Sequence, residues 1–326
     1  MSTIPVSDST LSAASPAERL RRLAAAVRVH FTWWGVHRTL TTQQKEEVGD
    51  AYGADARLLS AGKKIIDVRH EAFRRLTSLR TRIVASWRGL SLPYVEPGIR
   101  LIRQADVDAF VHTLEGFRDE LTQAEADLNA VYDQIKADAR QRLGRLYNPA
   151  DYPPQVRGLF AVAWDFPSVE PPSYLLRLNP DLYREEQERV ARRFEEAVRL
   201  AEQAFVSEFA RLVAHLTERL ANGEGGERRI FRDSVVTNLT EFFEKFKHLN
   251  VRSNEELDRL VEQAQELVRG VAPQDLRDND SLRHQVATQM AQVQARLDGL
   301  IVERPRRQII RSSAARNGAI THGAAD

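Results

Sequence analysis

The chain has 326 residues, 42% of them hydrophobic, which is enough to build one large or two ordinary domains around a substantial core. Lysine and arginine (47 residues) almost balance aspartate and glutamate (46), so no global charge attracts the protein to nucleic acid or to an anionic membrane. The absence of cysteine excludes disulfides, thiolate zinc sites and a cysteine nucleophile.

The first predicted elements are a short helix and a strand. Residues 1–14 are small and polar, and we expect a disordered tail there. Ser15, Pro16 and Glu18 then form a helix start, with a capping residue, a first-turn proline and a capping-box glutamate. Apolar and polar residues alternate from Val27 to Trp33, which predicts a half-buried strand.

This strand needs partners, and two later segments are candidates. Residues 98–103 follow a proline and read as a strand, and residues 159–166 are the third candidate. Residues 65–90 carry apolar residues at helical spacing and predict a helix between the first two strands. We therefore expect a small β-sheet head.

Two long amphipathic stretches dominate the middle of the chain. Residues 106–147 carry apolar residues at steps of three and four, the spacing of a coiled-coil seam, and residues 180–220 carry them at an eleven-residue period. The segment between them is rich in proline, which is incompatible with a continuous helix. The pattern predicts a long antiparallel helical hairpin, a coiled-coil-like arm whose seam closes either within the hairpin or between chains.

The glycine cluster after residue 221 predicts a domain boundary. Residues 233–250, 254–269 and 282–302 read as three helices, the second capped by Ser253. The sequence thus predicts a mainly α protein, divided into a disordered tail (1–14), a head with the helical-hairpin arm (15–222), a C-terminal helical unit (227–310) and a flexible basic tail (311–326).

No motif with defined catalytic geometry accompanies these elements. The Gly62-Lys63 pair resembles a P-loop, but Arg57 and Lys64 stand where that motif requires glycine and Ser or Thr, so we expect a turn before a helix. The histidines are scattered without metal-ligand spacing. We expect no enzyme, no cofactor and no metal site.

The strongest local charge lies in residues 63–88, where eight lysines and arginines face two acids. Such a helix suits a phosphate backbone. Residues 106–138, however, carry nine acids against two basic residues, so mutual neutralisation of the two helices is the favoured interpretation. A second basic cluster lies at residues 304–311 and is either a solvated tail or a contact for nucleic acid or an acidic partner.

Trp33 and Trp34 are the most distinctive short feature. Neighbouring side chains on a strand point to opposite faces, so one tryptophan can enter the core while the other needs a helix, a partner or a ligand to cover it. Core packing on both faces is the favoured interpretation. The full set of candidate interaction residues is Trp33, Trp34, Lys63, Lys64, Arg74, Arg75, Arg80, Arg82, Arg304, Arg306 and Arg307.

Several segments resemble a known family. WWGVHRTL at residues 33–40, SAGKKIID at 60–67, RLTSLRTRIVASW at 75–87 and GIRLI at 98–102, followed by the long acidic helix, are similar to a large bacterial and phage family of unknown function. Genes of that family tend to lie beside those of a MoxR-type AAA ATPase and a von Willebrand A-type protein. The resemblance implies an accessory subunit of an ATPase-driven remodelling system.

The functional expectation is therefore a non-enzymatic helical adaptor or assembly subunit that binds proteins, including an AAA ATPase or a von Willebrand A-type protein. The alternative is a nucleic-acid-associated protein that uses residues 63–88 and the C-terminal arginines. The sequence has no secretory signal at residues 1–20 and no run of eighteen apolar residues, so we expect a cytoplasmic protein that does not bind a membrane. The oligomeric state stays open.

Overall fold

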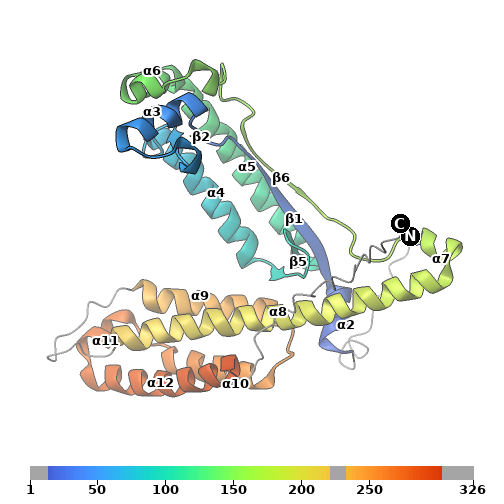
Figure 1. The fold of residues 1–326 in the computed structure, drawn as a ribbon. Coiled ribbons are helices and arrows are strands. Elements are labelled where there is room, and N and C mark those ends of the chain that lie inside the picture. The colour runs from blue at the N-terminus through green and yellow to red at the C-terminus, as the bar shows by residue number, and fades with distance from the viewer. Residues whose placement is uncertain (1–13, 221–232, 303–326) are drawn as a thin grey trace, which may run out of the picture.

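The computed structural model describes residues 14–220 and 233–302, which are mainly helical and include a small antiparallel sheet (Figure 1). The strands are β1 (Ala24–Trp33), β2 (His37–Thr39), β3 (Gly62–Lys64), β4 (Leu92–Pro93), β5 (Ile99–Arg103) and β6 (Phe160–Asp165). The helices are α2 (Pro16–Leu23), α3 (Thr42–Tyr52), α4 (Glu71–Gly89), α5 (Val107–Ala130), α6 (Tyr132–Leu143), α7 (Tyr174–Leu178), α8 (Pro180–Leu220), α9 (Ser234–Leu249), α10 (Glu255–Val268), α11 (Pro273–Asp278) and α12 (Asp280–Val302).

The predicted strand from Val27 to Trp33 is confirmed and begins three residues earlier. The order of the four-stranded sheet is β4-β5-β1-β6, with antiparallel neighbours. The first half of β1 pairs with β5 and the second half with β6, so that Ala24 lies opposite Arg103 and Trp33 opposite Phe160. Both predicted partners are therefore confirmed, and the Ser15 capping box of α2 is present as well.

The two faces of β1 enter different cores. Val27 and Val29 are buried in a cluster with residues of α4 and α5. Ala26 points to the opposite face and belongs to the cluster built around α8. We call the sheet with α3 to α6 the head, and α8 to α12 the bundle. Figure 1 shows α4 and α5 side by side along β1, with α8 crossing the lower end of the sheet.

The predicted hairpin between residues 106–147 and 180–220 is not confirmed. α5 packs against α4 and β6, whereas α8 packs against α2, α9 and α12. The first stretch is also interrupted: Val131, at φ −103° and ψ 5°, separates α5 from α6. The physical reason is that an apolar stripe shows that one face of a helix is buried but does not specify which segment buries it. Leu114 and Leu128 of α5 are buried inside the head.

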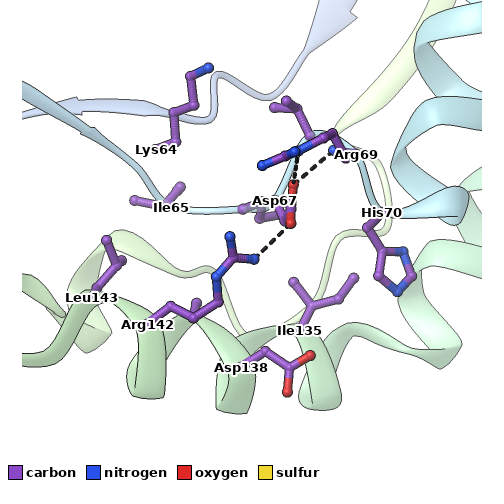
Figure 2. Close-up of a pocket in the computed structure, with 12 residues that line it drawn as sticks. Lys64, Ile65, Asp67, Arg69, His70, Ile135, Asp138, Arg142 and Leu143 are labelled. Atoms are coloured by element: carbon purple, nitrogen blue, oxygen red, sulfur yellow. Dashed lines mark hydrogen bonds and ion pairs between the residues drawn. The ribbon is translucent and has the colours of Figure 1, made fainter.

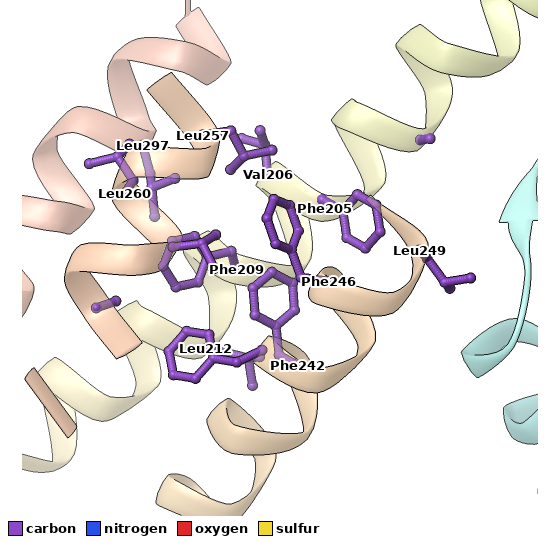
Figure 3. Packing of buried hydrophobic residues seen from close by; sticks show 14 of the residues in the cluster. Phe205, Val206, Phe209, Leu212, Phe242, Phe246, Leu249, Leu257, Leu260 and Leu297 are labelled. Carbon is purple, nitrogen blue, oxygen red and sulfur yellow. The ribbon is translucent and has the colours of Figure 1, made fainter. Parts of the chain in front are cut away.

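The bundle is held by a dense aromatic core (Figure 3). Phe209 of α8 stacks on Phe242 of α9 with ring centroids 5.0 Å apart, and Phe205 meets Phe246 edge to face at the same distance. Arg283 of α12 is buried and donates to the carbonyl oxygens of Arg219 and Leu220, which caps the end of α8. The core of α9, α10 and α12 therefore continues onto α8, which the sequence analysis placed in the other unit; the glycine cluster lies outside the described residues.

Two local predictions were wrong, and one helix was not predicted. Residues 62–64 form β3, which pairs with β2, so α4 begins only at Glu71 and its capping residue is His70. The cap of α10 is Asn254, whose side chain accepts from the Leu257 N–H, in place of Ser253. α3 has no counterpart among the predicted elements; it begins with a Thr41 capping box and ends at Gly53, whose φ of 63° favours glycine.

Candidate functional site

A cavity of about 420 Å³ lies between α6 and the segment that joins β3 to α4 (Figure 2). The lining includes Lys64 at the end of β3, and Asp67, Arg69 and His70 of the joining segment. Ile135, Asp138, Arg142 and Leu143 contribute from α6. The lining of the cavity combines four basic side chains, two carboxyl groups and apolar side chains such as those of Ile135 and Leu143.

The polar groups of this cavity bind one another. Arg142 donates from Nη1 to Asp67 Oδ2 over 2.7 Å, and the Arg69 N–H donates to Asp67 Oδ1 over 3.0 Å (Figure 2). The hydrogen bond from Arg142 is the main cause that lowers the pKa of the Asp67 carboxyl, and it raises the pKa of Arg142 in turn. His70 Nδ1 accepts from the Ala72 N–H, so the first turn of α4 is already capped. The Asp67 carboxylate thus already pairs with the Arg142 guanidinium in this cavity.

The cavity has no arrangement for metal binding. Within the described residues, no group of three His, Asp or Glu side chains is placed to hold a metal ion. The expected turn with Gly62 and Lys63 is part of β3, and Lys63 is buried, with Nζ 2.7 Å from Asp151 Oδ2 and bonded to the Leu146 carbonyl. Of the two candidate lysines, only Lys64 lines the cavity.

The basic helix α4 lies against the acidic helix α5, as the charge pattern indicates. Arg75 pairs with Asp127, and Arg82 Nη1 lies 2.8 Å from Glu120 Oε2. Arg80 instead places its guanidinium 4.9 Å from the ring of Trp33. Arg74 is exposed.

The two tryptophans are half-buried in the head. Trp33 meets Phe160 edge to face at 5.0 Å, and Trp34, just beyond the end of β1, meets Tyr132 of α6 at 6.1 Å. Both rings pack against the same core, that of the head, and Trp34 lies outside the strand, so the expected packing on opposite faces of the strand is not what the structure has. The remaining candidates, Arg304, Arg306 and Arg307, lie outside the described residues.

One exposed apolar surface of the described residues was not predicted from the sequence. Figure 1 shows α7 folded back on the start of α8, at the end that extends away from the head and the bundle. Leu176 is 53% exposed and Leu178 76% exposed, and Tyr174 and Leu182 are exposed beside them. We call these four residues the α7–α8 tip. The available signal was the apolar run from Tyr174 to Leu178 directly before the helix start at Asn179-Pro180.

Among the described residues, no helix combines the length and the apolar content that crossing a bilayer requires. Comparisons of the chain with protein-family models, with curated proteins and with solved structures found no match.

Proposed function

We propose that the protein is a non-enzymatic cytoplasmic adaptor or assembly subunit that binds a protein partner through the α7–α8 tip. The observation that carries this proposal is the exposure of four large apolar side chains at one end of the molecule. Large apolar groups gathered on the surface of a soluble protein mark interaction sites more often than scattered ones do.

The tip has the geometry of a contact arm. Val190 is the first buried residue of α8, so the ten residues before it, at 1.5 Å per residue, extend for roughly 15 Å. Charged residues on this segment pair within the helix, for example Arg184 with Asp181 over 2.8 Å. Because these charges are matched locally, recognition at the tip depends on apolar contact. In this proposal the start of α8 takes the role of the arm that the sequence analysis assigned to a coiled-coil hairpin.

The proposed partners are a MoxR-type AAA ATPase or a von Willebrand A-type protein. This part of the proposal depends on the family resemblance of residues 33–40, 60–67, 75–87 and 98–102 and on the gene neighbourhood of that family. An accessory subunit of a remodelling machine requires a stable body and a projecting contact surface, and the α7–α8 tip supplies the latter.

The test is site-specific photocrosslinking in the native host. A photoreactive residue at position 176 or 178 is expected to crosslink to an AAA ATPase or a von Willebrand A-type protein, identified by mass spectrometry. The matched control position is Arg145, which is 87% exposed and lies in the head. Leu176→Glu together with Leu178→Glu should abolish co-purification of the crosslinked partner without unfolding the protein, because both side chains are exposed. Crosslinks only to copies of this chain, or the same products from position 145, would contradict the proposal.

The nucleic-acid alternative has less support. Arg75 and Arg82 are paired with acids of α5, and Arg80 lies over an aromatic ring, which leaves Arg74 as the most available cation of the candidate set on α4. Nuclease treatment and added salt distinguish the two functions. A protein that binds the phosphate backbone loses its ligand steeply with salt, whereas an apolar contact at the tip does not.

A further inference from the structure

A second cavity, of about 290 Å³, opens where the head meets the bundle, and we call it the junction cavity. Its apolar wall comes from α2, β4, β5 and the end of α9 through Leu20, Leu92, Leu101 and Leu249. Leu23, at the end of α2, is 50% exposed and also belongs to the lining. Cavities of about 300 Å³ are at the lower end of the range for small-molecule sites, and such sites favour boundaries between structural units.

The polar part of the junction cavity is cationic. Arg19, Arg103, Lys247 and Arg252 line it, with His248, and none of the described lining residues is acidic. Arg19 donates to the carbonyl oxygens of Ala14 and Val251, at 2.6 and 2.9 Å, so its guanidinium is fixed in place by neutral acceptors. The charge of Arg19 is therefore held at the cavity without being neutralised there.

Two groups oppose this positive charge, and neither cancels it. Asp106 lies 2.7 Å from His248 Nε2 and 3.8 Å from Arg103 Nε, so one carboxylate serves both of these groups. The C-terminal end of α9, which carries partial negative charge, also faces the cavity. Arg103 Nη1 already donates a hydrogen bond of 3.2 Å to the His248 carbonyl oxygen at this end. Lys247 and Arg252, on the bundle side, take part in none of the ion pairs that the described residues form.

The backbone at Arg252 supports a binding role independently. Arg252 has a φ of 51° and is the one non-glycine residue in the described part of the chain with a positive φ. The turn is held by the Asn250 side chain, which accepts from the Arg252 N–H over 2.9 Å, and by Arg19 on the Val251 carbonyl. A left-handed conformation costs a residue with a Cβ free energy, and such strain gathers at functional sites. Glycine would adopt this conformation at position 252 without strain, but the chain has an arginine there.

We propose that the junction cavity binds a small anionic amphiphile, with one carboxylate or phosphate group against Arg252, Lys247 and Arg103 and a short apolar body against the leucines. The cationic side selects the charge of the ligand, and the volume limits the apolar part to a single short chain. This site is separate from the α7–α8 tip and does not depend on the adaptor function.

The test is calorimetric titration of the full chain with octanoate, octyl phosphate, octylamine and octanol. Octanoate or octyl phosphate should bind, and the preference between these two identifies the head group. Octylamine and octanol carry the same chain with a positive or no charge and should bind at least about tenfold more weakly. Equal affinity for all four would reduce the site to an apolar crevice and overturn the proposal, as would the absence of heat with both anions.

Two variants separate recognition from folding. Arg252→Gly removes the cation and relieves the positive φ, so affinity should fall about tenfold while the melting temperature does not fall. Leu23→Glu places a negative charge on a half-exposed lining position and should abolish binding of the anions. Arg145→Asn, an exposed arginine far from the cavity in the chain, is the matched control and should bind as the parent does. If Arg252→Gly binds octanoate or octyl phosphate as tightly as the parent protein does, the anion binds at another site and the proposal is wrong.

Discussion

At the scale of single residues, two buried tyrosines carry the clearest effect of their surroundings. Burial raises the pKa of Tyr132 and of Tyr152 to about 12, from the ordinary value of 10. The Tyr152 hydroxyl donates to the Ile65 carbonyl over 2.8 Å, whereas the Tyr132 hydroxyl is buried without a partner among the described residues. Both side chains lie in the core of the head, so their ionisation reports on its integrity.

The resulting prediction concerns alkaline stability. A phenol whose folded pKa is raised stabilises the native state fully below the unfolded pKa of 10, and this contribution is lost as the pH rises through the folded value of about 12. The free energy of unfolding should therefore decline over that interval. Urea unfolding at a series of pH values measures it, and tyrosinate absorbance follows the ionisation. Tyr152→Phe should remove one late-titrating phenol and flatten the decline; a decline of unchanged steepness would contradict the assignment.

At the scale of elements, a single buried carboxylate joins α5 to the start of β6. Glu125 Oε1 accepts from the N–H groups of Leu159 and Phe160, each over 3.0 Å, and Glu125 is 9% exposed. β6 is the outermost strand of the four-stranded sheet, next to β1, so the Phe160 N–H has no strand partner on its outer side among the described strands. Glu125 takes the place of that missing partner.

Removing this acceptor should destabilise the head. Glu125→Ala leaves the buried Phe160 N–H without its acceptor and the Leu159 N–H with only the Val156 carbonyl, 3.2 Å away. We expect the free energy of unfolding to fall by about 1–3 kcal/mol. Glu125→Gln keeps an oxygen of the same shape at the same place and is the matched control, with a much smaller expected loss. Chemical denaturation followed by tryptophan fluorescence measures both variants. Equal losses in the two would mean that the carboxylate charge, rather than acceptance of the two hydrogen bonds, stabilises β6.

The sequence predicted strands β1, β5 and β6 and the two long helices, but not the packing partners of those helices. Alternation along β1 was sufficient to predict the strand, because a half-buried strand requires it, and short bounded runs identified β5 and β6. The apolar stripes of α5 and α8 predicted two helices correctly, but a stripe shows only that one face of the helix is buried. Whether α4 or α8 covers α5 depends on how distant segments meet in space, which the spacing of apolar residues does not contain.

The same limit applies to the candidate site. Lys63 has the sequence context of an exposed phosphate ligand, yet it is buried beside Asp151, a residue 88 positions later in the chain. Lys64, its neighbour, lines the same cavity as Arg142 of α6, and only the folding of α6 over the β3–α4 segment brings the two residues to one cavity. The charge balance between α4 and α5, by contrast, was predictable, because opposite net charges on adjacent helices favour contact.

At the scale of the whole molecule, α8 joins one face of the sheet to the bundle. Its first buried residues, including Val190 and Phe194, share a cluster with Tyr94 and Leu101 of the head region, and its second half carries the bundle core (Figures 1 and 3). A second link is the contact of Arg103 and Asp106 with His248 at the end of α9. Changes in the bundle therefore reach the sheet through one continuous helix and through one polar contact beside the junction cavity.

The last prediction follows from this role of α8. A chain truncated after Gly226 lacks α9 to α12 and leaves buried residues such as Phe205, Phe209, Leu212 and Leu216 without cover. Burial of each such side chain is worth about 1.5–3 kcal/mol, so the second half of α8 should unfold or associate with other copies. Hydrogen exchange over residues 205–220 should show lost protection.

The head should survive this truncation, since its core draws on none of the removed helices. All four tryptophans, at positions 33, 34, 87 and 164, lie against that core, so tryptophan fluorescence reports on the head alone. We expect its cooperative unfolding transition to persist in the truncated chain, and sedimentation distinguishes unfolding of the second half of α8 from its association with other copies. A chain ending at Val302 retains both cores and is the matched control. A monomeric truncated chain with residues 205–220 still protected would show that α8 is stable without the bundle, and the boundary expected at residue 222 would then separate two independent units.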